Sequence, residues 1–171
     1  MPFYKQLGNI PHKRHTVFRQ ANGKLHHEQL FGTIGFDGMS SLLYHLHPPT
    51  IVKSIGEKVD LNPEIALEKD MQMRSLKGYE VAPVDDYIES RVPVLVNSDC
   101  HIILASPKKS LTDYFYKNGD ADEVIFIHEG SGTLKTQLGN IEFSYGDYLV
   151  VPRGMIYQIE FNTEENRLFI V

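Results

Sequence analysis

From about Arg91 to Val171, short apolar runs alternate with turn-forming residues. Pairs and triplets rich in Gly, Asn, Asp and Ser separate the runs at short intervals. The pattern predicts strands over residues 92–96, 101–105, 114–116, 124–128, 133–136, 141–143, 148–151, 155–161 and 168–171. Short strands at this spacing are typical of an antiparallel β-sandwich or β-barrel.

The first fifty residues carry a weaker strand pattern. Residues 28–33 and 40–47 both read as strands, and the glycine-rich Gly35-Phe36-Asp37-Gly38 between them predicts a turn. Pro48-Pro49 should end the second strand, because proline offers no backbone donor to a ladder.

Residues 51–90 are the least regular part of the chain. Asn62-Pro63-Glu64 predicts the start of a short helix that runs to about Asp70, because Asn caps helices and Pro suits their first position. Residues 71–83 could be extended. No linker composition separates this region, so we expect residues 1–90 to form an arm packed on a barrel built from residues 91–171.

The sequence stops inside the apolar run Leu168-Phe169-Ile170-Val171. A strand that ends on core residues, without a turn or polar tail, suggests a fragment of a longer chain. The last strand would then lie at an open sheet edge, and open edges promote association. We therefore expect the isolated chain to form a homo-oligomer or to dissolve poorly.

Composition narrows the function classes. The 171 residues are 42% hydrophobic and 23% charged, with a net charge of -5 and no dense Lys/Arg stripe, so nucleic acid is not an expected partner. The longest apolar runs are far too short for a membrane span, and the N-terminus lacks the apolar core of a signal peptide. Cys100 is the only cysteine, which fits a reducing cytoplasm; we predict that it is buried and inert.

The stretch from about Tyr114 onward resembles half of a cupin barrel. The first cupin motif has two histidines one residue apart, a glutamate four residues after the second, a strand and a Gly-x-Gly turn. Glu123 occupies the glutamate position, and Gly130-Ser131-Gly132 forms the turn. Counting back places Lys117 and Gly119 at the histidine positions. Neither is a ligand at neutral pH, because glycine has no side chain and lysine is protonated.

The second cupin motif also keeps its turns and loses its histidine. Gly146 and Pro152-Arg153-Gly154 fit the motif, but Tyr157 stands at the histidine position. Non-haem iron needs about two histidines and a carboxylate, and Glu123 alone cannot supply them. The residues therefore predict no complete metal site between Tyr114 and Val171.

Taken in order, four segments give the whole chain a resemblance to the N-terminal half of the homogentisate 1,2-dioxygenase family. They are Glu28-Gln29-Leu30-Phe31-Gly32, Leu43-Tyr44-His45-Leu46-His47-Pro48-Pro49, residues 115–123 (Phe-Tyr-Lys-Asn-Gly-Asp-Ala-Asp-Glu) and Gly154-Met155. The combination is specific, whereas cupin turns alone would be weak, because that fold serves many functions.

The resemblance implies an all-β, cupin-like double-stranded β-helix (jelly-roll) barrel with an irregular N-terminal arm and at most one or two short helices. It implies a full-length enzyme that uses Fe(II) and O₂ to open the ring of homogentisate, giving maleylacetoacetate in tyrosine and phenylalanine breakdown. The family's iron ligands lie in its C-terminal half, which would fall beyond Val171. No catalytic or metal residue carries over, so this segment alone should be inactive and bind no iron.

Histidines form two further groups. His45 and His47 alternate on a predicted strand and could face one metal ion, although a structural or interface role is favoured because no third ligand is near. His12, His15, His26 and His27 fit a solvated arm; the alternative is an arm that reaches the carboxylate substrate of a neighbouring subunit.

Other chemistry is weakly supported. Asp120-x-Asp122-Glu123 lacks the spacing and glycine of a calcium-binding loop and fits solvated loop charge. Ser40-Ser41 has no nucleophile elbow around it. Two hypotheses remain: the N-terminal part of a ring-cleaving dioxygenase, or a non-catalytic, metal-free cupin module with a structural or ligand-binding role.

Overall fold

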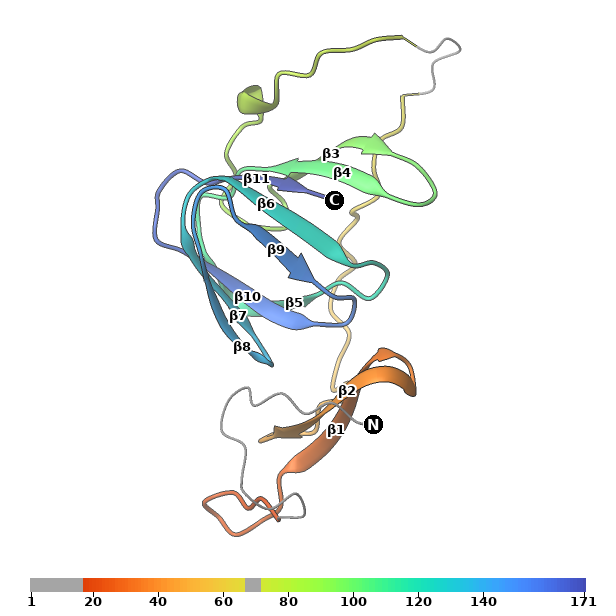
Figure 1. Ribbon diagram of the computed structural model, residues 1–171, viewed down its shortest axis with the longest axis vertical. Helices are drawn as coiled ribbons and strands as arrows, with labels where there is room; N and C mark the ends of the chain where they lie inside the picture. The colour runs from red at the N-terminus through yellow and green to blue at the C-terminus, as the bar shows by residue number, and fades with distance from the viewer. Residues whose placement is uncertain (1–16, 67–71) are drawn as a thin grey trace. The chain divides into compact units, whose positions relative to one another are not determined.

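The computed structural model describes residues 17–66 and 72–171 (Figure 1). The chain forms two compact units, Met1–Asp60 and Leu61–Val171. The division predicted between residues 90 and 91, and the packing of an arm on the barrel, stay predictions. His12 and His15 lie outside the described residues, so the grouping of the four N-terminal histidines stays a prediction as well.

A two-stranded hairpin lies in the first unit. Strand β1 (His27–Ile34) pairs antiparallel with β2 (Asp37–His45), which confirms the predicted hairpin. The second strand ends two residues earlier than predicted. Gly35 and Gly38 have φ of 54° and 74°, a region that glycine enters without steric cost, so these positions let the chain reverse direction.

Helical structure is almost absent from the described residues. Residues 61–66 contain no helical turn at the predicted helix start, and the rest of that predicted helix lies outside the described residues. A single 3₁₀ turn, η1 (Gly78–Glu80), interrupts the segment that could have been extended. No helix in the described parts of the chain has the length and hydrophobicity that spanning a membrane requires.

The second unit contains all nine strands predicted from Arg91 onward. They are β3 (Arg91–Val96), β4 (His101–Ala105), β5 (Leu111–Lys117), β6 (Glu123–Glu129), β7 (Gly132–Thr136), β8 (Gly139–Phe143), β9 (Tyr148–Val151), β10 (Ile156–Phe161) and β11 (Arg167–Ile170). Strand β5 begins three residues earlier than predicted, at the buried Leu111.

These strands form two antiparallel sheets of a cupin-like jelly roll (Figure 1). The five-stranded sheet has the order β3-β4-β11-β6-β9, and the four-stranded sheet has the order β5-β10-β7-β8. Alternate side chains point into the space between the sheets, as the period of a strand requires. The side chains buried there include Ile125, Ile127, Leu134, Phe143, Leu149, Ile159, Leu168 and Ile170. The fold class is therefore all-β, as predicted.

The final strand does not lie at an open edge. Strand β11 pairs with β4 on one side and with β6 on the other. Even Val171 exchanges two backbone hydrogen bonds with Val124, at 2.8 and 2.9 Å. The expectation of an unpaired last strand is wrong, because the chain returns to the middle of the five-stranded sheet.

Cys100 is exposed, contrary to the prediction that it is buried. It closes the turn between β3 and β4, where its amide donates to Asn97 Oδ1 at 2.7 Å. Its carbonyl accepts from the Asn97 amide at 3.1 Å. These bonds keep the residue in the turn, ahead of the apolar strand β4.

Candidate functional site

A tight turn in front of β3 directs two side chains into the sandwich. Asp86 Oδ1 accepts hydrogen bonds from the amides of Ile88 and Glu89 at 2.7 and 2.9 Å. Burial raises the pKa of Asp86, but the Tyr114 hydroxyl and these two amides outweigh it and hold the pKa below its usual value. The turn places Tyr87 and Arg91 at the end of the core.

Arg91 is the centre of the buried cluster. Its Nη1 donates to Glu123 Oε1 at 2.6 Å, and its Nη2 donates to the hydroxyls of Tyr87 and Tyr157 at 2.8 and 3.1 Å. The guanidinium carbon also lies 4.7 Å from the ring centre of Tyr87 and 5.0 Å from that of Tyr116. Arg91 therefore combines an ion pair, neutral hydrogen bonds and cation–π contacts.

Glu123 meets this cation from the start of β6. The residue is only 3% exposed, so the prediction of a solvated loop charge is wrong for Glu123. Its second oxygen, Oε2, accepts from the Tyr157 hydroxyl at 2.7 Å, and Asn118 Nδ2 lies 3.3 Å from Oε1. Asp120 and Asp122 are exposed, as predicted. The carboxylate is thus fully engaged by groups of the chain itself.

Burial raises the pKa of two phenols in the cluster. It is the main cause that raises the pKa of Tyr157 well above its usual value, and it also raises the pKa of Tyr116. Burial lowers the pKa of Arg91, but the neighbouring Tyr87, Tyr157 and Glu123 raise it well above its usual value. The cluster therefore holds a charged guanidinium beside the neutral phenols of Tyr116 and Tyr157 at neutral pH.

In the structure, the two histidine positions of the first cupin motif lie one residue earlier than the spacing predicted. Lys117 and Gly119 are exposed, whereas Tyr116 and Asn118 are partly buried and contact the cluster. Tyr116 lies opposite Tyr157 in the β5–β10 register, with ring centres 5.4 Å apart. Counting by spacing selected the wrong face of β5, because a shift of one residue moves a strand's side chains to the other face.

These residues do not fit Fe(II). Non-haem iron takes imidazole and carboxylate ligands, but here the ligand places hold two protonated phenols, an amide and one carboxylate. That carboxylate already accepts from Arg91 Nη1 at 2.6 Å. A metal ion in this place would stand beside a guanidinium of the same sign. Among the described residues, no group of three or more His, Cys, Asp and Glu side chains is placed to hold a metal.

The histidine pair on the hairpin has other neighbours. His45 Nε2 lies 2.8 Å from Gln29 Oε1, and His45 stands opposite His27 in the β1–β2 register. His47 lies beyond the end of β2 and is exposed. The structure thus brings together His27 and His45, one from each predicted histidine group, while Ser40 and Ser41 remain exposed on β2.

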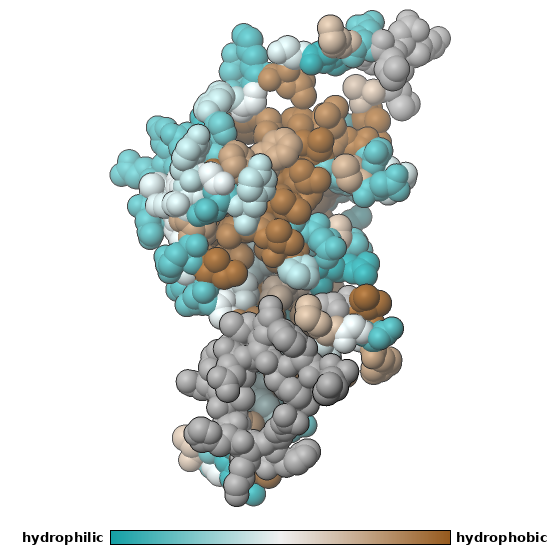
Figure 2. Space-filling view, in the orientation of Figure 1, coloured by the Kyte–Doolittle hydropathy of each residue, from teal (hydrophilic) through white to brown (hydrophobic). Residues whose placement is uncertain are grey.

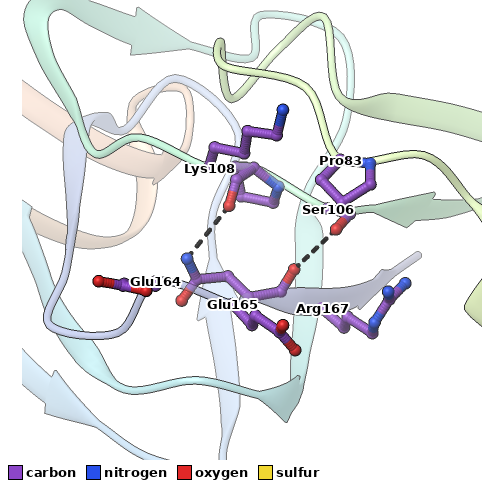
Figure 3. A pocket seen from close by; sticks show the side chains of 8 residues that line it. Pro83, Ser106, Lys108, Glu164, Glu165 and Arg167 are labelled. Carbon is purple, nitrogen blue, oxygen red and sulfur yellow. Dashed lines mark hydrogen bonds between the residues drawn. The ribbon is translucent and has the colours of Figure 1, made fainter.

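Two shallow cavities lie outside the cluster. One of about 420 Å³ is shown in Figure 3, where Lys108 and Arg167 line it together with Glu164 and Glu165. Its buried polar groups bond within the chain: Ser106 Oγ donates to the Asn166 carbonyl at 3.1 Å, and Asn166 Nδ2 donates to the Pro107 carbonyl at 3.1 Å. The second is lined by Tyr79, His128, Glu129, Gly130 and Tyr145. Neither contains a residue of the Arg91 cluster.

The outer face of the five-stranded sheet is apolar. Figure 2 shows hydrophobic side chains gathered over β4, β6 and β9. We call this surface the outer face; its exposed members are Val92, Leu95, Tyr148, Val150, Phe169 and Val171, and the partly buried Ile102, Leu104, Val124 and Phe126 lie between them. Contiguous apolar surface of this kind marks a contact site on a protein.

Sequence reasoning missed Arg91 and Tyr87 altogether. Arg91 is 32 residues from Glu123 in the sequence, and Tyr87 is 70 residues from Tyr157. Strand alternation would have been misleading, because it places Arg91 on the face opposite the apolar Val92, whereas Val92 is 42% exposed in the structure and Arg91 points into the sandwich.

Two comparisons identify relatives of this chain. Residues 19–171 match the family model described as homogentisate 1,2-dioxygenase N-terminal. A protein of Saccharolobus solfataricus named "Putative dioxygenase SSO1533" is 38% identical over 173 residues, which cover 100% of this chain and 44% of that protein. The chain therefore spans less than half the length of this relative.

Solved cupin structures resemble this chain more distantly. A cupin-2 domain protein of Shewanella frigidimarina is 22% identical, with a TM-score of 0.41, over 47% of this chain and 76% of that one. A cupin protein of Bacteroides fragilis is 17% identical, with a TM-score of 0.42, over 61% of this chain and 82% of that one. The fold assignment rests on the sheet topology, and these likenesses carry no functional argument.

Proposed function

The chain belongs to the homogentisate 1,2-dioxygenase N-terminal family, and from this premise we propose that it is the metal-free N-terminal part of an Fe(II)-dependent ring-cleaving dioxygenase. The proposed reaction converts homogentisate and O₂ to maleylacetoacetate. Iron, the aromatic acid and O₂ would bind to a part of the enzyme outside this segment. The chain's own role would be to supply a rigid β-sandwich.

The observation that carries this proposal is the Arg91–Glu123 ion pair inside a cupin fold, where both side chains are at most 10% exposed. A cupin module that catalysed oxygen chemistry itself would need open ligand positions for iron. Here the one carboxylate is bound by a guanidinium and a phenol. Family membership therefore supports a dioxygenase-related function. The engaged carboxylate supports a non-catalytic role for this part of the enzyme.

Oxygen consumption tests the proposal directly. The protein produced from its native gene, supplied with Fe(II), should consume O₂ when homogentisate is added and should contain iron. The isolated 171-residue chain should do neither. Phenylacetate, which lacks the ring hydroxyls, is the matched substrate control and should give no uptake.

Two outcomes would overturn parts of this proposal. Stoichiometric iron in the isolated chain would contradict the metal-free assignment. Turnover of a different dihydroxyaromatic acid, with none of homogentisate, would reject the proposed substrate. Both measurements use the same protein preparations.

A second candidate function is a non-catalytic cupin module that works without the rest of a dioxygenase. The same cluster favours it, because Tyr87, Arg91, Tyr157 and Glu123 bond to one another without a metal ion. A thermal-shift screen of small aromatic acids distinguishes the two functions. Tight binding by the isolated chain would favour the second candidate, whereas homogentisate-dependent O₂ uptake by the protein from the native gene would favour the first.

We also propose that a second copy of this chain covers the outer face. The six exposed apolar side chains of that face are 38–67% exposed, and a contiguous apolar patch of this kind is typical of a protein–protein contact. Strands β9 and β6 present Tyr148, Val150 and Phe126 there without a charged side chain between them. An uncharged, apolar surface matches a second copy of itself without charge repulsion.

The double substitution Tyr148→Lys/Val150→Lys should shift the isolated chain toward the monomer. Both residues are about two-thirds exposed, so lysine is tolerated in the fold but places charge inside the contact. Light scattering over a range of protein concentrations measures the change. Leu138→Lys, in the turn between β7 and β8, is the matched control and should leave association unchanged. A wild-type chain that is already monomeric at high concentration would contradict the proposal.

A further inference from the structure

The cupin metal position in this chain is surrounded by residues that point to one place from both sheets. Glu123 and Arg91 come from the five-stranded sheet, and Tyr116 and Tyr157 come from the four-stranded sheet. Tyr87 reaches the same place from the turn before β3, with its hydroxyl 3.3 Å from that of Tyr157. A single group at the centre therefore joins both sheets and the preceding segment.

We propose that the guanidinium of Arg91 is a built-in replacement for the metal ion of a cupin. A buried carboxylate requires a compensating cation, and Arg91 Nη1 supplies it at 2.6 Å from Glu123 Oε1. The same guanidinium donates to Tyr87 and Tyr157, as a metal would draw its ligands together. The proposal holds for either of the two candidate functions.

The surroundings of the guanidinium suit this organic cation and not a metal ion. Two aromatic rings, Tyr87 and Tyr116, lie 4.7 and 5.0 Å from its central carbon, and a delocalised guanidinium is stabilised by such faces. Its planar fork reaches several acceptors at once. Because the cation is covalently part of the chain, no chelator can remove it.

Metal binding gives the first test. The triple variant Arg91→Ala/Tyr116→His/Tyr157→His keeps Glu123 and supplies two imidazoles, the ligand set of a mononuclear metal site. We expect it to bind about one Co²⁺ per chain, seen as visible absorption, whereas the wild type binds none at this place. Adding Glu123→Gln to the triple variant is the matched control and should abolish that absorption. A folded triple variant that binds no more Co²⁺ than the wild type would overturn the proposal.

The wild-type chain gives a second test that does not depend on a variant that folds. Its melting temperature should be unchanged by EDTA and by added Co²⁺, and a fall with EDTA would overturn the proposal.

Chemical rescue gives a third test. Ethylguanidinium at millimolar concentration should raise the melting temperature of Arg91→Ala by refilling the vacated place, but not that of the wild type. Ethylammonium at the same concentration is the control cation. Equal rescue by the two cations would show that a guanidinium is not required and would overturn the proposal.

Discussion

Replacing Arg91 with methionine is expected to lower the free energy of unfolding by about 3–5 kcal/mol, because it removes one partner of a buried ion pair. The carboxylate of Glu123 would stay 3% exposed, with only Tyr157 and Asn118 as hydrogen-bond donors. Tyr87 would lose the donor that holds its hydroxyl at 2.8 Å. Urea denaturation of the isolated chain, followed by circular dichroism, measures the loss.

A double variant and an exposed pair serve as controls. Arg91→Met/Glu123→Leu removes both charges and should recover most of the lost stability, because neutralising a buried pair costs less than breaking it. Lys77→Met breaks the Lys77–Glu80 pair, whose side chains are 77% and 71% exposed, and should cost less than about 1 kcal/mol. A loss for Arg91→Met that is no larger than for Lys77→Met would contradict the importance of the cluster.

The strands of the second unit were predictable from the sequence because their signals are local. In β6, Glu123, Ile125 and Ile127 are buried while the residues between them are more exposed. Turn residues such as Gly146, with φ of 90°, mark the strand boundaries. What the sequence could not provide was the strand order, because β11 returns between β4 and β6 through pairings distant in sequence.

The buried cluster was only half predictable. The cupin pattern identified Glu123 and Tyr157, since each sits at a fixed distance from glycine turns. Arg91 and Tyr87 belong to no motif, and only the folded sandwich brings them to Glu123 and Tyr157. Glu123 follows Asp120-x-Asp122 and therefore resembled an exposed loop charge. Its burial is possible because Arg91, 32 residues earlier in the sequence, supplies the compensating cation.

Replacing Gly132 with alanine is expected to cost about 3 kcal/mol or more, at or above the upper end for overpacked sites. Gly132 begins β7, where the added Cβ would lie 1.9 Å from the Glu160 carbonyl oxygen and 2.8 Å from the Phe143 ring. The carbonyl belongs to β10, the neighbouring strand, so relief requires the β7–β10 ladder to separate. The second glycine of the Gly130-Ser131-Gly132 turn is therefore required by close backbone approach in this chain.

Gly119→Ala is the matched control for this substitution. Gly119 has no atom within 4 Å of an added Cβ and no positive φ, so alanine should change stability by less than about 0.5 kcal/mol. Both variants are compared by thermal unfolding of the isolated chain. The motif spacing predicted Gly119 at a metal-ligand position, but in the structure no neighbouring atom prevents a side chain there. Equal stability of the two variants would contradict the close approach at Gly132, since only that glycine has a neighbouring strand in its way.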